Sequence, residues 1–397
     1  MHMSEGFAGL AIRRLFSRQN AIILLALAAF LFMVFIRLGS QPGALSPAEH
    51  TAAIHSQSFH LIAKNPLNAP HDLLSLGLSK ISGAHVAMRA ASAIWGVIFA
   101  IAFYSITKSM FGKTIGLVGA IILVTTPLFL ISSRQASADI MLAAPALIMA
   151  LYLWVSRPAS DVAKALPLLI IFSCLMLYVP GMVWWLIGGA VAGRTKLENA
   201  LSSAPKHRLY LSMTVGLAII VPLALAIATD WRLIRPLALV PSHFSSPLNE
   251  LKNVGWMTAA WFAKTPFHSP LIIGRLPLLN IVQDVLLVFG AYALFQAAKS
   301  KAWALVAAFA FATVAAGLND NLSLLLIGLP AAGLLFTTGL RYLYVEWRGV
   351  FPRNPAAKYL AILLIAVIGA VQLLFGARYA LVAWPHNVVT RQTYVIK

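Results

Sequence analysis

The residues best suited to chemistry lie in one stretch, from Gly39 to Arg89, between the first two apolar segments of the chain. It contains five of the ten histidines, which are His50, His55, His60, His71 and His85. It also contains two of the eleven acidic residues, Glu49 and Asp72. Carboxylates beside imidazoles are typical of proton-transfer sites and of metal sites. In an enzyme, this loop would therefore carry a large share of the active site.

The histidine spacing argues against a metal site. His50, His55 and His60 are five residues apart, which spreads them around a helix, whereas structural metal ligands are usually paired more tightly. We expect no metal and no cofactor, and we interpret these histidines as interfacial polar residues. His71 and Asp72, at the start of a second short helix expected over 71–81, are candidate substrate-binding residues.

The sequence predicts a local structural role for Glu49, at the start of a helix. Ser46-Pro47-Ala48-Glu49 is a capping box with proline at the first helical position, and it predicts a helix lying along the membrane surface. A carboxylate at this position could also act as a general base, or orient the acceptor. The two roles are compatible, so Glu49 is a candidate catalytic residue.

Composition places most of the chain in a membrane. Of the 397 residues, 60% are hydrophobic and only 10% are charged, and mean hydropathy is +0.84. Soluble domains carry roughly 25% charged residues. The net charge of +19 does not indicate nucleic acid, because Lys and Arg flank the apolar segments and form no basic face. Membrane lipids are thus expected partners, and nucleic acid is not.

The apolar segments predict an all-α polytopic membrane protein with about eleven transmembrane helices. We place them near residues 21–38, 89–107, 114–132, 139–155, 165–179, 181–192, 209–229, 280–298, 302–318, 321–341 and 358–380. Residues 1–397 are expected to form a single membrane domain. The pair over 165–192 is ambiguous, because Tyr178-Val179-Pro180-Gly181 fits either an outer turn or a kink in one long helix.

Charge predicts the orientation. Short basic connections, beginning with Arg13 and Arg14, fall on one side if the N-terminus is cytoplasmic. The loops 39–88 and 230–279 then both lie outside, so that one site can draw on both. We expect an integral protein of a bacterial plasma membrane with its active-site loops on the outer face.

Other candidates lie on the same expected face. Asp139 begins an apolar segment, where a carboxylate either complements the helix dipole or is functional, and Arg134 is its expected partner. Arg89 either snorkels to the interface or holds a phosphate. Asp139 is therefore a candidate catalytic residue, and Arg89 and Arg134 are candidate substrate-binding residues.

The second loop is basic and rich in tryptophan. Arg232, Arg235 and Arg275 are candidates for binding an anionic lipid headgroup, and plain anchoring to the bilayer is the alternative for each. Residues 249–264 fit an amphipathic surface helix.

The order of these features resembles a known family. The first feature is the acidic residue early in the first loop. The proline-containing link Asn68-Ala69-Pro70-His71-Asp72-Leu73-Leu74 follows it, and then Ala87-Met88-Arg89-Ala90-Ala91-Ser92-Ala93 at the start of the second apolar segment. The last features are Phe111-Gly112-Lys113 and Thr126-Pro127-Leu128-Phe129-Leu130, which leads to Arg134 and Asp139. Together they resemble the C-type (GT-C) membrane glycosyltransferases, in the branch of protein O-mannosyltransferases and the lipid A aminoarabinose transferase. Residues 324–342 are similar to a late apolar span of that family.

The resemblance implies transfer of a sugar from a polyprenyl-phosphate carrier to a lipid, glycan or protein acceptor at the outer face. The family begins its first loop with an Asp-Glu pair whose Asp is the expected base, and here that pair is Ala48-Glu49. The family's Pro-Pro-Leu is Ala69-Pro70-His71. Glu49, Asp139 or Asp72 would then supply the base. The alternatives are a non-catalytic relative that binds a lipid-linked sugar, and a transporter or flippase of a lipid-linked precursor, for which Asp284 is the main intramembrane charge.

Overall fold

A computed structural model describes residues 18–81, 83–156, 159–266 and 269–396. Within these ranges the regular structure is helical, and the only strand-like pairing is an isolated antiparallel bridge between Leu45 and Ile396. The expected all-α architecture is confirmed. The basic residues Arg13 and Arg14, from which the orientation was predicted, lie outside the described ranges.

Within the described ranges, eleven apolar helical segments form the bundle, and each coincides with one of the predicted segments. Six are long enough to cross a membrane: α6 (Ala84–Phe111), η1 with α9 (Ala138–Ala143 and Pro145–Val155), α13 (Lys206–Thr229), α17 (Lys299–Leu318), η3 with α18 (Leu322–Gly328 and Leu329–Val350) and α19 (Pro355–Arg378). Five apolar stretches are shorter, at 10–17 residues: Asn20–Phe35 in α2 (Arg18–Phe35), α7 (Lys113–Val124), Lys164–Met176 in α10 (Ala159–Met176), α11 (Met182–Ala192) and α16 (Ile281–Ala297). The number that cross the bilayer stays a prediction.

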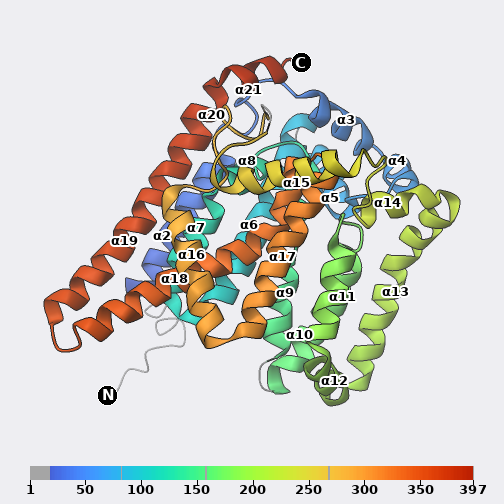
Figure 1. The fold of residues 1–397 in the computed structure, drawn as a ribbon. Helices are drawn as coiled ribbons and strands as arrows, with labels where there is room; N and C mark the ends of the chain where they lie inside the picture. Colours follow the sequence, from blue (N-terminus) through green and yellow to red (C-terminus); the bar gives the residue numbers. More distant parts are fainter. Residues whose placement is uncertain (1–17, 82, 157–158, 267–268, 397) are drawn as a thin grey trace, which may run out of the picture.

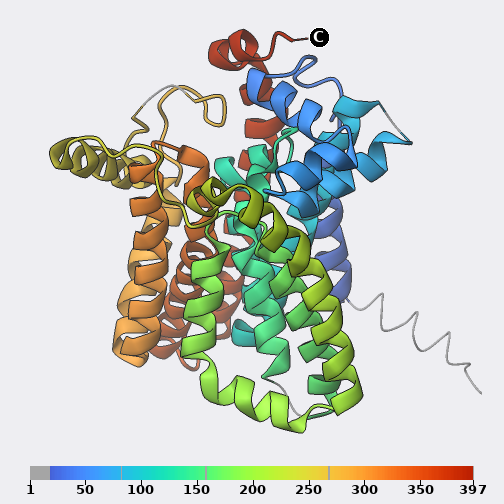
Figure 2. The same ribbon diagram turned by 90° about the vertical axis from the view of Figure 1, so that its right-hand side faces the viewer.

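The remaining short helices gather at one end of the bundle, called here the loop end (Figures 1 and 2). They are α3 (Pro47–His55), α4 (Phe59–Lys64), α5 (Ala69–Ser79), α8 (Pro127–Ser132), η2 (Trp231–Leu233), α14 (Ile234–Leu237), α15 (Pro247–Phe262), η4 (Tyr379–Ala383), α20 (Trp384–His386) and α21 (Val388–Thr393). Of the short helices that the structure describes, only α12 (Arg194–Ser203) lies at the opposite end. The two long loops therefore meet at one end, and the membrane face of that end stays a prediction.

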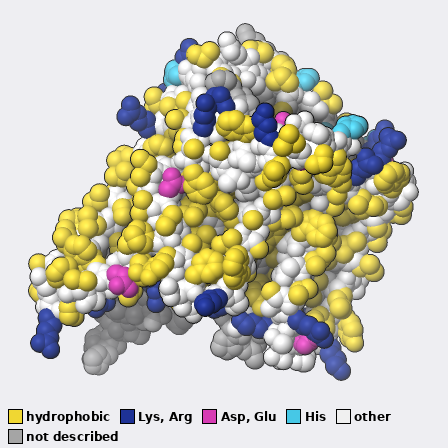
Figure 3. Space-filling view, in the orientation of Figure 1, with side chains coloured by type: hydrophobic (Ala, Val, Ile, Leu, Met, Phe, Trp, Pro, Cys, Tyr) yellow, Lys and Arg dark blue, Asp and Glu magenta, His cyan; other side chains and the backbone are white. Residues whose placement is uncertain are grey.

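The surface of the bundle has the pattern expected of a membrane protein. A broad hydrophobic band crosses the molecule, and Lys and Arg side chains gather along both of its borders (Figure 3). Exposed apolar side chains on α13 and α19 include Leu217, Leu363 and Leu374. Apolar side chains that would be costly to expose to water are thus placed where lipid would cover them.

The segment 165–192 forms two helices joined by a turn. Helix α10 ends at Met176, α11 begins at Met182, and Gly181 has φ +79°, which a residue without Cβ adopts readily. The turn belongs to the loop end, because the N–H of Asn68 donates to Tyr178 O (2.9 Å) and the N–H of Gly181 donates to Leu237 O (2.8 Å). Of the two alternatives left open by the sequence, a turn between two helices is the one observed, and the membrane face on which it lies stays a prediction.

The centre of the bundle is η3 with the first half of α18. Every residue of η3 is buried, and so are almost all residues of α18 as far as Leu340. A helix that is apolar on all sides is expected to be surrounded by other helices. Helix α16 crosses α18 at two glycines, where a Cβ on Gly290 would lie 1.9 Å from Leu335 O and one on Gly339 would lie 2.1 Å from Leu286 O. Such small residues let two backbones approach closely in a membrane.

This crossing predicts that Gly290→Ala lowers thermal stability, because the added methyl group meets backbone atoms that cannot rotate away. We expect a loss of about 1–3 kcal/mol in the free energy of unfolding. Gly188→Ala in α11 is the matched control, since no atom lies within 4 Å of the Cβ it adds. Equal melting temperatures for the two variants in the same detergent would contradict the close crossing.

Candidate active site

Glu49 holds the start of α3. Its backbone N–H donates to Ser46 Oγ (3.1 Å), and its own Oε2 accepts the Ser46 N–H (3.2 Å), with Pro47 at the first helical position. The capping box expected from the sequence is therefore confirmed. The same carboxylate also reaches well beyond its own helix.

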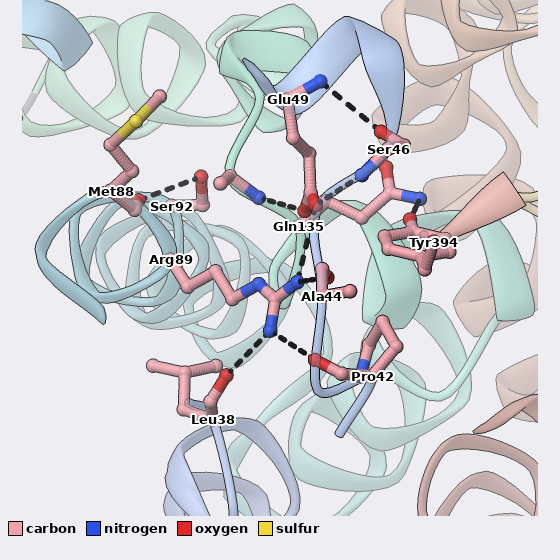
Figure 4. A network of polar contacts seen from close by, with 11 residues as sticks. Leu38, Pro42, Ala44, Ser46, Glu49, Met88, Arg89, Ser92, Gln135 and Tyr394 are labelled. Carbon is pink, nitrogen blue, oxygen red and sulfur yellow. Dashed lines mark hydrogen bonds and ion pairs between the residues drawn. The ribbon is translucent and has the colours of Figure 1, made fainter. Parts of the chain in front are cut away.

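Glu49 forms a buried ion pair with Arg89 of α6. Oε2 lies 3.1 Å from Arg89 Nη2, and each side chain is only 2% exposed. The other oxygen, Oε1, accepts the backbone N–H of Ala136 at 2.6 Å. Figure 4 shows this carboxylate enclosed between α3, α6 and the segment around Gln135. Both carboxylate oxygens are therefore hydrogen-bonded within the protein, and the side chain is closed off from solvent.

Arg89 is similarly occupied. Nη1 donates to Leu38 O (3.1 Å) and Pro42 O (2.6 Å), and Nη2 donates to Ala44 O (2.8 Å) as well as to Glu49. The guanidinium points into the turn that joins α2 to α3 (Figure 4). It does not extend toward the membrane interface, so the snorkelling interpretation is wrong. Its donors hold the beginning of the first loop in place and are not turned toward a ligand.

Arg134 closes the end of α2. Its Nη1 donates to Met33 O and to Val34 O (3.1 Å), and Nη2 donates to Ile36 O (3.1 Å). These are carbonyls at the C-terminal end of a helix, which lack partners within the helix. Burial, together with the charge of Arg89, lowers the pKa of Arg134 to about 10, so it still carries its charge at neutral pH.

The expected pairing of Arg134 with Asp139 is wrong. Both residues are described, and no ion pair joins them, because Arg134 turns toward α2. Asp139 Oδ2 instead accepts the hydroxyl of Ser137 (3.1 Å), and the hydroxyl of Ser323 in η3 is also within hydrogen-bonding reach. The Asp139 side chain remains partly exposed at the start of η1. Asp139 is thus less buried than Glu49, which is 2% exposed.

A chain of polar contacts connects Asp139 to the first loop. Asp72 lies between two imidazoles, with Oδ2 3.0 Å from His55 Nδ1 and Oδ1 3.0 Å from His71 Nδ1. His71 Nε2 lies 2.9 Å from Ser92 Oγ, and that hydroxyl donates to Ser137 O at 2.9 Å.

This series of hydrogen bonds positions Ser137 through buried side chains. His71 and Ser92 are fully buried, and Asp72 nearly so. The Ser92 hydroxyl donates to Ser137 O and lies 2.9 Å from His71 Nε2, so it links the buried imidazole to the segment before Asp139. His71 and Asp72 thus support the segment that carries Asp139, and His55 is the partly exposed end of the chain.

The three arginines of the second loop differ in availability. Arg275 donates from Nε to Thr265 O (2.9 Å) and from Nη2 to Pro266 O (2.7 Å), so it closes its own loop. Arg232 and Arg235 in η2 and α14 are exposed, and Arg235 lies over the Trp231 ring at 5.3 Å. These two can meet an anionic group. The surface helix expected over 249–264 is observed as α15.

The sequence analysis missed the contribution of the C-terminal tail. Tyr394 Oη accepts from Gln135 Nε2 (2.8 Å), and burial, with the nearby Glu49 carboxylate, raises the pKa of Tyr394 well above its usual value. Trp384 Nε1 donates to Pro270 O (2.6 Å). The tail therefore braces both loops. The available signal was an aromatic pair, Trp384 and Tyr394, in a segment too short to span a membrane.

No metal site was expected. Among the residues with described placement, no group of three or more His, Cys, Asp or Glu side chains is arranged to hold a metal ion. The Asp72 carboxylate is instead hydrogen-bonded to the two imidazoles.

Comparison with known proteins identifies the fold. Residues 73–225 match the family model described as dolichyl-phosphate-mannose-protein mannosyltransferase. The structure is similar to ArnT from Cupriavidus metallidurans in the apo state, with TM-score 0.59 and 16% identity over 95% of this chain and 78% of ArnT. It is also similar to ArnT from Cupriavidus metallidurans bound to undecaprenyl phosphate, with TM-score 0.58 and 16% identity. That match covers 94% of this chain and 78% of ArnT. No curated protein sequence matches the chain.

These matches confirm the resemblance to the C-type membrane glycosyltransferases. The chain is an integral membrane protein with the fold of that class.

The buried ion pair predicts a large difference between two similar substitutions. Glu49→Gln leaves Arg89 without a counter-charge in a buried site, so we expect a loss of about 3 kcal/mol in the free energy of unfolding. Glu198→Gln breaks the exposed pair with Arg194, whose side chains are 79% and 56% exposed, and is the control. It should cost less than about 0.5 kcal/mol. Thermal unfolding in detergent measures both, and equal effects would contradict the structural role of Glu49.

Proposed function

We propose that this protein transfers a sugar from a polyprenyl-phosphate carrier to an acceptor at the loop end of the bundle, on the outer face of the membrane. The single observation that carries the proposal is the partly exposed Asp139 carboxylate, held by buried groups at the loop end of a C-type glycosyltransferase fold. The matching family model names a dolichyl-phosphate-mannose donor, and one similar structure is of ArnT with bound undecaprenyl phosphate. Both support a polyprenyl-phosphate donor here.

In this proposal Asp139 is the general base. The acceptor hydroxyl attacks the anomeric carbon, its proton passes to the Asp139 carboxylate, and the bond from that carbon to the phosphate oxygen breaks. Polyprenyl phosphate leaves with the electron pair, and the sugar is transferred with inversion. A base must reach the proton that it removes, and the partly exposed Asp139 meets this requirement better than Glu49, which is 2% exposed.

Glu49 acts as a positioning residue in this scheme. It binds the N–H of Ala136, three residues before Asp139, and thereby fixes the segment that carries the base. The position at which the family places its catalytic Asp is Ala48, which is exposed on the first turn of α3. Separate residues thus perform the two tasks, and Glu49 does not need to react.

The leaving phosphate requires cations near its developing charge. Arg89 and Arg134 are committed to backbone carbonyls and to Glu49. Arg232 and Arg235 are exposed at the loop end and are therefore the stronger candidates for this role.

A second candidate function follows from the exposed Ala48. If Asp139 does not remove the proton, the protein is a non-catalytic relative that binds a polyprenyl-phosphate sugar. Such a protein would bind the lipid-linked sugar tightly and release no polyprenyl phosphate from it.

The base assignment predicts that Asp139→Asn lowers the transfer rate by at least about 100-fold, because the amide cannot take the acceptor proton. The protein is reconstituted in proteoliposomes with a panel of undecaprenyl-phosphate hexoses and pentoses and a cell-envelope extract as acceptor. Released undecaprenyl phosphate is the measured product. Asp230→Asn is the matched control, since Asp230 is an exposed loop-end carboxylate that caps η2. Wild-type rates in Asp139→Asn would reject Asp139 as the base.

The polar chain predicts that Ser92→Ala also slows the reaction, by less than Asp139→Asn does. Loss of the bond to Ser137 O loosens the segment before Asp139, so we expect kcat to fall by about ten-fold with little change in KM for the donor. Ser105→Ala on the same helix is the control, because its hydroxyl only donates to Ile101 O one turn earlier. A change confined to KM, or equal effects of both variants, would exclude the positioning role.

A further inference from the structure

A pocket lies at the loop end between the start of the first loop and the C-terminal tail. It has a volume of about 240 Å³, and Tyr394 separates it from the polar network around Gln135. Its lining residues are Ser40, Gln41, Pro42, Gly43, Pro385, His386, Arg391 and Tyr394. The proposed chemistry at Asp139 uses none of them.

The chemistry of the lining favours an anion. No lining residue is acidic, and the exposed Arg391 guanidinium makes no hydrogen bond or ion pair with the described residues. His386 is also exposed, and its Nδ1 donates to Val382 O (2.6 Å), so Nε2 of the neutral ring is an acceptor. A guanidinium presents a planar set of donors that matches phosphate and carboxylate oxygens. Arg391 and the Gln41 amide are therefore the main donors of the lining, and the Ser40 hydroxyl, which donates to Arg37 O at 3.5 Å, is a weakly held third.

The walls of the pocket are fixed by contacts already described. Arg89 Nη1 donates to Pro42 O at 2.6 Å and so fixes residues 40–43, which form the first-loop side of the pocket. Leu45 and Ile396 exchange two backbone hydrogen bonds of 2.8 and 3.1 Å, which fasten the tail to the loop. Gln135 and Pro270 hold Tyr394 and Trp384 from the other side. A pocket formed by distant segments in this way is preorganised for a ligand.

The position of the pocket suggests which substrate reaches it. Helices α20 and α21 lie at the tip of the loop end, beyond the hydrophobic band (Figures 1 and 3). The phosphate of a lipid-linked donor is expected at the border of that band, so a group in this pocket would arrive from the aqueous side.

We propose that this pocket binds an anionic group, a phosphate or a carboxylate, carried by the acceptor. The acceptor role rests on the proposed transferase function, whereas binding of the anion does not. The acceptor is then an acidic glycan or an acidic lipid headgroup. Arg391 makes the pocket prefer an anionic acceptor over a neutral one.

Binding of inorganic phosphate tests the pocket directly. The full chain is reconstituted in phosphatidylcholine nanodiscs, and line broadening in ³¹P NMR gives the Kd. We expect Arg391→Gln to raise this Kd about ten-fold, because a charge-assisted hydrogen bond is lost. Ser40→Asp, which adds a negative charge to the lining, should raise it by at least as much.

The matched control is Arg353→Gln. Arg353 lines a pocket formed by residues 351–355, between α18 and α19 and away from the loop end, and its loss should leave the Kd unchanged. Wild-type affinity in Arg391→Gln would overturn the proposal. So would binding that is lost in Arg353→Gln and kept in Arg391→Gln. Circular dichroism and melting temperature confirm that each variant is folded.

A second arm separates the two sources of the anion. Nanodiscs that contain phosphatidic acid should displace phosphate if the pocket takes a lipid headgroup, and should leave phosphate bound if it takes a soluble acidic glycan. In the transfer assay, Arg391→Gln should raise KM for the acceptor and leave kcat unchanged. If transfer survives in Asp139→Asn while Arg391→Gln loses phosphate, the base assignment fails and the pocket stands. If Arg391→Gln binds phosphate normally, the pocket fails whatever the transfer rate.

Discussion

The ion pair between Glu49 and Arg89 is the interaction on which the loop end depends. Taking both charges out of water is costly, and only well-placed additional hydrogen bonds make such a pair tolerable. Here Glu49 also binds Ser46 N–H and Ala136 N–H, and Arg89 also binds the carbonyls of Leu38, Pro42 and Ala44. One pair thus joins the start of α3, helix α6, the turn after α2 and the segment before Asp139. The pocket beside the C-terminal tail rests on the same contacts.

Local features of the fold could be predicted from the sequence, and long-range partners could not. The apolar segments and the Ser46–Glu49 capping box are encoded within a few neighbouring residues, so the sequence predicted each of them. Arg89 lies 40 residues from Glu49, and Ala136 lies 87 residues from it. Nothing in the local sequence distinguishes an arginine that binds backbone carbonyls from one whose donors are available to bind a phosphate. For the same reason the sequence paired Arg134 with Asp139, whereas the fold turns Arg134 toward the end of α2.

The two roles proposed for Glu49 and Asp139, positioning residue and general base, follow from the difference in their burial. A carboxylate that is enclosed and fully hydrogen-bonded can fix geometry but cannot easily exchange a proton with a substrate. A carboxylate held only by hydroxyl groups and open on one side can do so. The fold encloses Glu49 and Arg89, leaves Asp139 half-buried at the start of η1, and exposes Arg232 and Arg235 in η2 and α14. Under the proposed function, a lipid-linked donor would reach Asp139 without leaving the bilayer.

The most direct test of this account is an experimental structure of the full chain with a non-hydrolysable polyprenyl-phosphate sugar bound in nanodiscs. The account predicts that the anomeric carbon lies beside Asp139, and that Glu49 still contacts Arg89 and the N–H of Ala136. A structure in which the ion pair is broken, and the sugar lies beside Glu49 with Asp139 turned away, would contradict it.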